Sequence, residues 1–423
     1  YIFYDKIYKK YLTKFKNTLK FKEKNMLKGK CVVIGVTGGI ACYKVANLVS
    51  MLKKSGADVN VIMTKNATQF ISPLTFETLS GNKCIIDTFE RKANYDVEHI
   101  SLAKKADIIM IAPATANIIA KIANGIADDM LTTTILASKC KKIVAPAMNT
   151  NMYENKITQD NIEKLKYYDF EIIEPACGLL ACKDIGIGKM PEPNILFEYI
   201  LKELAFEKTM KGKNVLISAG ATCEYIDPVR YITNPSSGKM GFSLAKVCML
   251  KGANVTLVCG KTSVEPPMFT NIINVVSAQD MFNTFKDIHK NFDIIFMTAA
   301  VSDFTPANIH TEKVKKHMVN DNNLQLKQTQ DILKYLGENK PKEQILCGFS
   351  METENLLENS KIKLNKKNLD YIVANNLKEE GAGFGVDTNI ATLISKDNCI
   401  SFDKLTKFEL ANKIVDNILN NMI

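Results

Sequence analysis

Short apolar runs alternate with amphipathic stretches along most of the chain. This alternation predicts parallel strands with helices packed on both faces of each sheet. In the first half, strands are expected at residues 31–36, 59–63, 108–112, 143–145 and 171–173. Residues 43–54 predict a helix between the first two strands, because their apolar positions recur with helical spacing.

The same pattern starts again after residue 212, which predicts a second domain of the same class. Lys-Ser-Gly-Ala-Asp-Val at 54–59 and Lys-Gly-Ala-Asn-Val at 251–255 stand at equivalent places in the two halves. Two doubly wound, Rossmann-like α/β domains are therefore expected, over residues 27–205 and 206–423. The second would hold strands at 214–218, 256–258, 293–298, 344–347 and 370–373, a hairpin of 389–394 with 398–402, and helices at 241–250 and about 404–420.

The composition of the chain excludes several classes of protein. With 423 residues it is long enough for two domains, and no apolar run approaches the roughly 20 residues of a membrane-spanning helix. Much of the net charge of +10 lies in residues 1–25, where eight lysines outnumber Asp5 and Glu23. The charge of the remaining residues therefore does not indicate a basic surface that binds nucleic acid. Eleven cysteines without a CxxC motif or a secretory signal indicate reduced thiols and a cytoplasmic protein.

Residues 1–26 are interpreted as a basic leader outside the folded body. They lack the apolar core of a secretory signal and the arginines and serines of an organellar transit peptide. Met26 directly precedes the first expected strand region, so we expect the native start there. A short amphipathic helix that docks elsewhere is the alternative interpretation.

A glycine turn follows the first expected strand. Gly38 and Gly39 would let backbone N–H groups approach a phosphate at the start of the next helix. The turn lacks the full G-x-G-x-x-G spacing, and Thr64 follows the second strand where an NAD site needs a carboxylate for the ribose. The pattern therefore favours a mononucleotide such as FMN over an NAD-dependent dehydrogenase. For this motif alone, a tight turn without a ligand is the alternative.

Two further turns of small and polar residues follow expected strands. Thr115 and Asn117 follow the strand at 108–112, and Asn149 follows the strand at 143–145. Ligands bind at the carboxyl ends of strands in such folds, so these side chains indicate a phosphate or flavin site. Cys182 lies in a glycine-bearing segment that is interpreted as a flap, with an inert thiol as the alternative. For His99, a structural role is the alternative to that of a base.

These motifs belong to a longer series that runs through both halves in order. The series comprises Gly-Val-Thr-Gly-Gly-Ile-Ala at 35–41, His-Ile at 99–100, Ala-Pro-Ala-Thr-Ala-Asn at 112–117, Pro-Ala-Met-Asn at 146–149, Ala-Cys-x-Asp-x-Gly-x-Gly-x-Met at 181–190, Asp-Pro-Val-Arg-Tyr-Ile-Thr-Asn at 227–234, Ser-Ser-Gly-Lys-Met-Gly at 236–241, Ala-Ala-Val-Ser-Asp at 299–303 and Glu-Lys-Val-Lys-Lys at 312–316. From about Leu27 onward, the chain resembles the bifunctional phosphopantothenoylcysteine decarboxylase / phosphopantothenate–cysteine ligase family of coenzyme A biosynthesis.

For the first half, the resemblance implies a flavodoxin-like, FMN-dependent decarboxylase domain. His99 would be the base beside the flavin, which oxidises the cysteinyl thiol to a thioaldehyde so that the neighbouring carboxylate leaves as carbon dioxide. Asn149 would bind that carboxylate, and Cys182 would return a proton at the end of the reaction. The FMN-binding residues implied are Gly38, Gly39, Ile40, Thr64, Ala112, Thr115, Asn117 and Ala147.

For the second half, the resemblance implies a ligase domain with a mainly parallel sheet. CTP would activate the carboxylate of 4′-phosphopantothenate as an acyl-cytidylate, and the amine of L-cysteine would attack it. Asn234 would hold this intermediate and Arg230 would place the substrate. The CTP-binding residues implied are Asp303, Lys313, Asp331, Ile332, Phe349, Lys363 and Lys367. Mg²⁺ is expected with CTP, and no side chain is assigned to it.

The resemblance also implies a homo-oligomer with FMN near the interfaces between decarboxylase domains. Lys363 and Lys367 lie four residues apart on a helix expected at 354–367 and hence on one face, for which a solvated basic face is the alternative. A non-catalytic FMN-binding regulatory flavoprotein is the alternative function. The presence of His99, Asn149 and Cys182 together, and of a ligase half, disfavours it.

Overall fold

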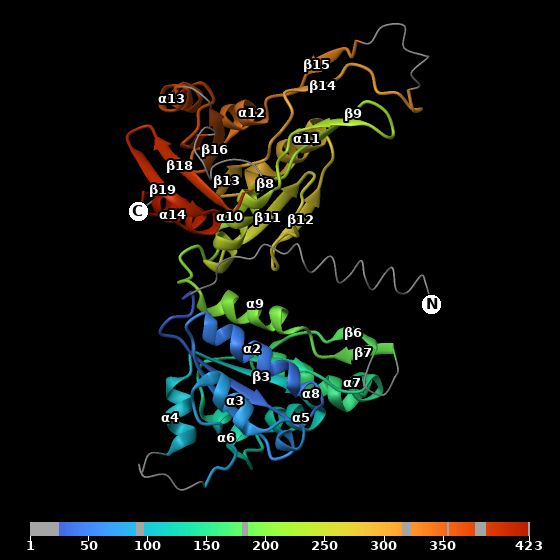
Figure 1. Ribbon diagram of the computed structural model, residues 1–423, viewed down its shortest axis with the longest axis vertical. Coiled ribbons are helices and arrows are strands. Elements are labelled where there is room, and N and C mark those ends of the chain that lie inside the picture. Colours follow the sequence, from blue (N-terminus) through green and yellow to red (C-terminus); the bar gives the residue numbers. More distant parts are fainter. Residues whose placement is uncertain are drawn as a thin grey trace. The chain divides into compact units, whose positions relative to one another are not determined.

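The computed structural model describes residues 25–89, 97–179, 185–314, 323–352, 355–376 and 386–421. These residues form two compact units that meet in the sequence between Phe206 and Glu207 (Figure 1). Each unit is an α/β domain with a mainly parallel sheet, as the alternation of apolar and amphipathic stretches predicts. Within the described ranges, no helix combines the length and apolar character that crossing a bilayer requires.

The first unit is built on a five-stranded parallel sheet in the order β2-β1-β3-β4-β5, which is the flavodoxin-like arrangement. The strands are β1 (Cys31–Val36), β2 (Asp58–Met63), β3 (Ile108–Ala114), β4 (Lys141–Pro146) and β5 (Glu171–Ile172). Every residue of β1 and β3 is buried, because helices cover both faces of the sheet. These helices are α2 (Cys42–Lys54), α3 (Pro73–Ser80), α4 (Glu98–Lys105), α5 (Ala116–Ala123), α6 (Met130–Ala137), α7 (Thr150–Glu154), α8 (Lys156–Tyr167) and α9 (Pro193–Leu204).

A two-stranded hairpin follows this sheet. Its strands, β6 (Ala176–Leu179) and β7 (Ile185–Lys189), are antiparallel. The backbone N–H of Met148, just after β4, donates a 3.0 Å hydrogen bond to the carbonyl of Gly188. The hairpin is therefore attached to the loop that carries Asn149. Cys182, at the predicted flap, lies outside the described residues.

The second unit is built on an eight-stranded sheet in the order β12-β11-β8-β13-β16-β17-β18-β19. The strands are β8 (Asn214–Ala219), β11 (Asn254–Cys259), β12 (Asn271–Asn274), β13 (Ile294–Met297), β16 (Ile345–Glu352), β17 (Tyr371–Asn376), β18 (Thr388–Ser395) and β19 (Cys399–Thr406). The first six are parallel, and the antiparallel pair β18–β19 is the predicted hairpin. Smaller antiparallel pairs join β9 (Cys223–Tyr225) to β10 (Tyr231–Thr233) and β14 (Phe304–Pro306) to β15 (Leu326–Gln328).

The helices of the second unit are α10 (Lys239–Leu250), α11 (Ala278–Ile288), α12 (Ile332–Asn339), α13 (Leu356–Lys366) and α14 (Lys407–Asn420). All ten residues from Gly241 to Leu250 of α10 are buried, because this helix lies between the sheet and α14 (Figure 1). Helix α10 is therefore the most enclosed helix of this unit, and its N-terminus is fixed from both sides.

Several helix boundaries differ from the sequence-based expectation by up to three residues. Helix α14 begins at Lys407, because Thr406 and Glu409 form a capping box that fixes the first turn there. Helix α13 ends at Lys366, and Lys367 is its C-cap residue, whose N–H still donates a 3.0 Å helical hydrogen bond to the carbonyl of Lys363. Lys363 and Lys367 therefore lie one helical turn apart at the end of α13.

Candidate functional site

The first unit contains a cavity of about 580 Å³ at the carboxyl ends of β1, β3 and β4. This is the point where the strand order reverses, and ligands bind there in doubly wound folds. Asn149 lies on the cavity wall, where it is the N-cap residue of α7. Five of the predicted FMN-binding residues also line the cavity: Gly38, Gly39, Ile40, Thr115 and Ala147.

The wall of this cavity fits a flat, largely apolar group that carries a phosphate. A Cβ atom on Gly38 would lie 2.5 Å from the Cβ of Asn66, so only glycine allows the chain to turn this closely here. Helix α2 starts at this turn without a side-chain cap, and the positive end of its dipole therefore favours an anion at this place. Met148 and Met152 supply apolar surface. A flavin mononucleotide has both of these properties.

Several residues predicted for the first site do not line the cavity. Thr64 accepts a 3.4 Å hydrogen bond from the N–H of Ala67, and Ala112 is fully buried within β3. Asn117 is exposed on α5, and His99 lies in the first turn of α4. Their roles toward FMN and substrate stay predictions, as does the role of Cys182.

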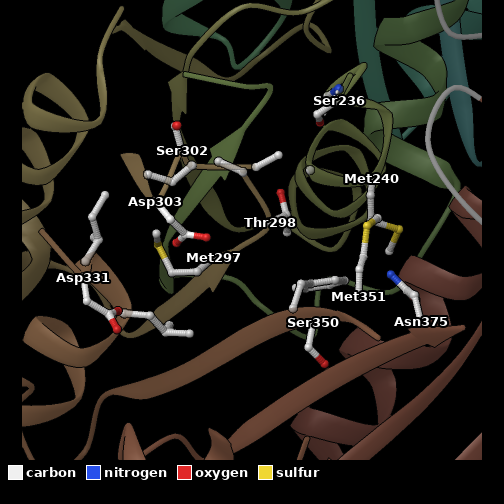
Figure 2. Close-up of a pocket in the computed structure, with 18 of the residues that line it drawn as sticks. Ser236, Met240, Met297, Thr298, Ser302, Asp303, Asp331, Ser350, Met351 and Asn375 are labelled. Carbon is white, nitrogen blue, oxygen red and sulfur yellow. Dashed lines mark hydrogen bonds between the residues drawn. The ribbon is translucent and has the colours of Figure 1, made fainter. Parts of the chain in front are cut away.

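The second unit contains a cavity of about 710 Å³ at the carboxyl ends of β13, β16 and β17 (Figure 2). In Figure 2 the Asp303 carboxylate points into this cavity near Thr298, while Asp331 and Asn375 lie on opposite sides of it. Six of the seven residues predicted to bind CTP line the cavity: Asp303, Asp331, Ile332, Phe349, Lys363 and Lys367.

The floor of the second cavity is held by hydrogen bonds between strand ends. The buried hydroxyl oxygen of Ser218 accepts hydrogen bonds from the backbone N–H groups of Thr298 and Ala299, each at 3.0 Å. A Cβ atom on Gly241 would lie 2.6 Å from the Thr298 hydroxyl oxygen, so this glycine lets α10 pack directly against the strand ends. Together these contacts place the N-terminus of α10 at the cavity.

At one end of the cavity, Lys367 forms an ion pair with Asp331, the N-cap residue of α12. The ammonium of Lys367 lies 3.0 Å from one carboxylate oxygen of Asp331, whose other oxygen accepts a 2.9 Å hydrogen bond from the N–H of Lys334. Asp331 therefore caps α12 and orients Lys367 at the same time. Ile332, the first residue of α12, is largely buried and lines the cavity next to Asp331, and Lys363 lines it from α13.

Arg230, Lys313 and Asn234 do not line the cavity. The buried carboxylate of Asp227 accepts hydrogen bonds from the Arg230 side chain and, at 3.2 Å, from the N–H of Val314, next to Lys313. The Arg230 hydrogen bonds are the main reason that the pKa of Asp227 lies well below its usual range. Asn234 donates a 3.2 Å hydrogen bond to the carbonyl of Ala300, a cavity residue, and so lies just behind the wall.

Sequence reasoning missed one end of the second cavity. Lys239, Asn375, Asn389 and Lys407 line it there. Lys239 belongs to the Ser-Ser-Gly-Lys-Met-Gly motif. This motif marks the N-terminus of α10, but it does not show where the side chain of Lys239 points. The sequence around Lys407 has no motif that would identify it as a site residue, because its place in the cavity depends on how α14 packs.

Two family models match the chain, one for each unit. The model described as "Flavoprotein" matches residues 20–205, and the model described as "DNA/pantothenate metabolism flavoprotein C-terminal domain" matches residues 210–422. Their junction coincides with the division between the two units to within a few residues.

Curated relatives extend over nearly the whole chain. The coenzyme A biosynthesis bifunctional protein CoaBC of Bacillus subtilis is 47% identical over 375 residues, which cover 88% of this chain and 92% of that protein. Its counterpart in Borreliella burgdorferi is 44% identical over 391 residues, which cover 92% of this chain and 99% of that protein. The solved C-terminal domain of a CoaBC protein is 39% identical, covers 51% of this chain and 98% of that domain, and gives a TM-score of 0.44. The resemblance stated from the motifs is confirmed: the chain belongs to the family of CoaBC coenzyme A biosynthesis bifunctional proteins.

Proposed function

We propose that the second unit joins L-cysteine to 4′-phosphopantothenate with CTP, and that the first unit decarboxylates the product to 4′-phosphopantetheine with FMN. The observation that carries the first step is the 710 Å³ cavity, since it gathers six residues predicted to bind CTP from separate parts of the sequence. Full-length similarity to bifunctional relatives disfavours a non-catalytic regulatory flavoprotein, which would not need a ligase half.

In the ligase cavity, different charged groups bind different parts of the nucleotide. Lys363 and Lys367 supply cations for phosphate oxygens, and Asp303 faces the same space as a ligand for the Mg²⁺ that accompanies CTP. Ile332 and Phe349 supply an apolar surface for the base. As the acyl-cytidylate forms, the same cations stabilise the charge that develops on the phosphoryl group.

In the decarboxylase cavity, FMN supplies the two-electron oxidation and reduction that make decarboxylation of the cysteinyl group feasible. The backbone at Gly38 and Gly39 and the N-terminus of α2 hold its phosphate, and Thr115 contributes a hydroxyl. Asn149 orients the substrate carboxylate from the wall of the same cavity. His99 removes the proton from the thiol, and Cys182 returns a proton to the product.

The same chain is proposed to act as a homo-oligomer with FMN near the interfaces between decarboxylase units. Large apolar side chains around the first cavity support this proposal, because they are about half exposed or more in the isolated chain. They are Ile40 at 55%, Tyr43 at 58%, Met152 at 49% and Leu179 at 65%. Exposed apolar groups that gather around a ligand site are typical of a surface that another subunit covers.

The proposed function is tested by incubating the FMN-loaded chain with 4′-phosphopantothenate, L-cysteine, Mg²⁺ and either CTP or ATP, with mass spectrometry of the products. We expect 4′-phosphopantetheine and carbon dioxide with CTP, and far less with ATP. Asp303→Asn should lose at least tenfold in ligation, because the metal-bound triphosphate loses its carboxylate partner. Asp397→Asn, in the turn between β18 and β19, is the matched control and should keep normal rates. No product with either nucleotide would contradict the proposal.

A further inference from the structure

Asp227 lies in the turn between β9 and β10 and is only 1% exposed. A carboxylate is seldom buried this deeply unless hydrogen bonds and an opposite charge stabilise it. Its two oxygens have different partners. One oxygen, Oδ1, accepts hydrogen bonds from the backbone N–H groups of Val229 at 2.9 Å and Arg230 at 2.8 Å. This oxygen shapes the turn itself, as an aspartate at the start of a turn commonly does.

The other oxygen, Oδ2, connects the turn to a distant segment of the chain. It accepts hydrogen bonds from the Nε and Nη2 groups of Arg230 and, at 3.2 Å, from the N–H of Val314. The Nη2 group also donates a 2.9 Å hydrogen bond to the carbonyl of Val314. A few residues earlier, the N–H of His310 donates a 3.0 Å hydrogen bond to the carbonyl of Ile226. The segment at 310–314 is therefore held against the turn at both of its ends.

Lys313 lies within this held segment, directly before Val314. Its side chain is exposed, and no described residue forms a hydrogen bond or an ion pair with its ammonium. The Arg230 side chain is half exposed, and its Nη1 group also has no partner in the described part of the chain. The contact of Arg230 with Val314 thus places the backbone of Lys313 beside a second cation, and both side chains keep donors for an anion.

We propose that Asp227 is a positioning residue of the ligase reaction, which fixes the backbone at Lys313, through Val314 and Arg230, before CTP binds. The inference rests on the proposed function and on the roles that the family resemblance implies for Lys313 and Arg230. Neither of these two residues lines the second cavity, so their places depend on contacts outside it. Groups that are fixed before the substrate binds lower the barrier, because little has to be ordered during the reaction.

Asp227→Asn tests the role of Oδ2 alone. The asparagine keeps one oxygen for the N–H groups of Val229 and Arg230, but its NH₂ group cannot accept the hydrogen bonds from the Arg230 side chain and from Val314. Asp227→Ser also keeps one oxygen in the turn, and it replaces the first variant if the asparagine prevents folding. Circular dichroism checks the folding of both variants.

Asp370→Asn is the matched control. One carboxylate oxygen of Asp370 also has a cation and a backbone group as partners, because it accepts hydrogen bonds from Lys340 and, at 2.7 Å, from the N–H of Leu346. These residues lie near the amino ends of β16 and β17, whereas the second cavity lies at the carboxyl ends of the strands. The control should therefore lower the stability of the unit and change ligation by no more than about twofold.

Hydrogen exchange with mass spectrometry measures the positioning directly, in the full chain without substrates. Asp227→Asn should make the amides at 310–314 exchange at least about fivefold faster, because the N–H of Val314 loses its acceptor and the segment opens more often. Peptides from β8 and β13 should not change, and Asp370→Asn should leave the exchange at 310–314 unchanged. Unchanged exchange at 310–314 in Asp227→Asn would overturn the proposal.

A kinetic cycle distinguishes positioning from a role in stability alone. In a single turnover with CTP, Mg²⁺ and 4′-phosphopantothenate but no cysteine, the carboxylate joins the α-phosphorus of CTP, and the pyrophosphate that leaves is measured. As the only substitution, Asp227→Asn should lower this rate about tenfold. In the Lys313→Met chain it should lower the rate no more than about threefold, because the residue that Asp227 positions is already lost.

A larger loss in the Lys313→Met chain, or no loss from Asp227→Asn alone, would also overturn the proposal. Failure of the proposed function would appear differently, as a folded chain without substitutions that releases no pyrophosphate from CTP. The hydrogen-exchange measurement would then still decide whether Asp227 holds the segment that carries Lys313.

Discussion

Replacement of Ser218 by alanine should weaken the second unit selectively. Ser218 is fully buried at the end of β8, and its hydroxyl oxygen is the acceptor for the N–H groups of Thr298 and Ala299. Alanine removes that oxygen and leaves both N–H groups without a protein partner. The two residues that carry them line the cavity of the second unit, so the effect should reach the proposed nucleotide site.

The size of the effect follows from the two hydrogen bonds that are lost. A buried donor left without a partner costs about 1–3 kcal/mol. Because the cavity lets water approach Thr298 and Ala299 from one side, the total should lie in the lower part of the combined range, at about 2–4 kcal/mol. Ser243→Ala is the matched control, because Ser243 is equally buried and its hydroxyl donates a 2.8 Å hydrogen bond to the carbonyl of Lys239. That carbonyl keeps its helical N–H partner, so the control should cost less than about 1 kcal/mol.

Native-state hydrogen exchange with mass spectrometry measures this in the full chain, because peptides from the two units report separately. Ser218→Ala should lower the opening free energy of peptides from β8 and β13 by about 2–4 kcal/mol, and peptides from β1 and β3 should not change. CTP-dependent ligation should also decrease, while decarboxylation of supplied phosphopantothenoylcysteine continues. If Ser218→Ala costs no more than Ser243→Ala, the two hydrogen bonds do not hold the cavity floor and the reasoning is refuted.

Three further predictions concern the two sites. His99→Asn should abolish carbon dioxide release and leave cysteine ligation nearly intact, since the two cavities share no residue; equal loss of both activities in a folded variant would contradict this. Cys182→Ser should still release carbon dioxide but leave FMN reduced and yield an oxidised aminoenethiol product, because a serine hydroxyl is a poor proton donor. Stopped-flow flavin absorbance and mass spectrometry of the products test this. Normal reoxidation of the flavin would show that the thiol has only a structural role. Lys407 should lose its charge as the pH rises through about 8, because burial and the charge of Lys239 lower its pKa against the opposing effect of Asp387. Between about 8 and 10.5 the unfolded chain holds more protons than the folded one, so the stability of the second unit should rise with pH across this range; denaturant unfolding should show a flatter profile for Lys407→Met.

The sheets were predictable because their centres are apolar. The expected strand at 31–36 coincides with β1, and the one at 389–394 lies within β18. The expected strand at 398–402 overlaps β19, which begins one residue later and continues to Thr406. The carboxyl ends of strands were less predictable. Strand β16 continues from the expected end at Cys347 to Glu352, because its last residues stay paired with β17 although they are polar or face the cavity. Where polar residues at the end of a strand line a site, a prediction based on apolar runs ends the strand too early.

The residues of the candidate sites were also predictable only where a local pattern marks them. Asp303 and Phe349 were identified because each follows an apolar strand or belongs to a motif, and both line the cavity. Lys407 was not identified, because a charged residue at a helix start is expected to face water. Its burial results from the packing of α14 on α10, which joins segments more than 150 residues apart in the sequence. Contacts at that separation leave no trace in local spacing.

The packing of α14 across α10 also sets an order of events during synthesis. The first unit is complete in sequence at Phe206, but the ligase cavity lacks one of its walls until Lys407 has been made. At translation rates of about 5–20 residues per second, those roughly 200 residues take about 10–40 s. During that interval the ribosome carries a finished flavodoxin-like domain that is able to take up its cofactor, beside a sheet whose central helix is still uncovered. The apolar surface of the nascent ligase half therefore stays uncovered for longer than that of the decarboxylase half, and ribosome pausing before α14 would prolong its exposure.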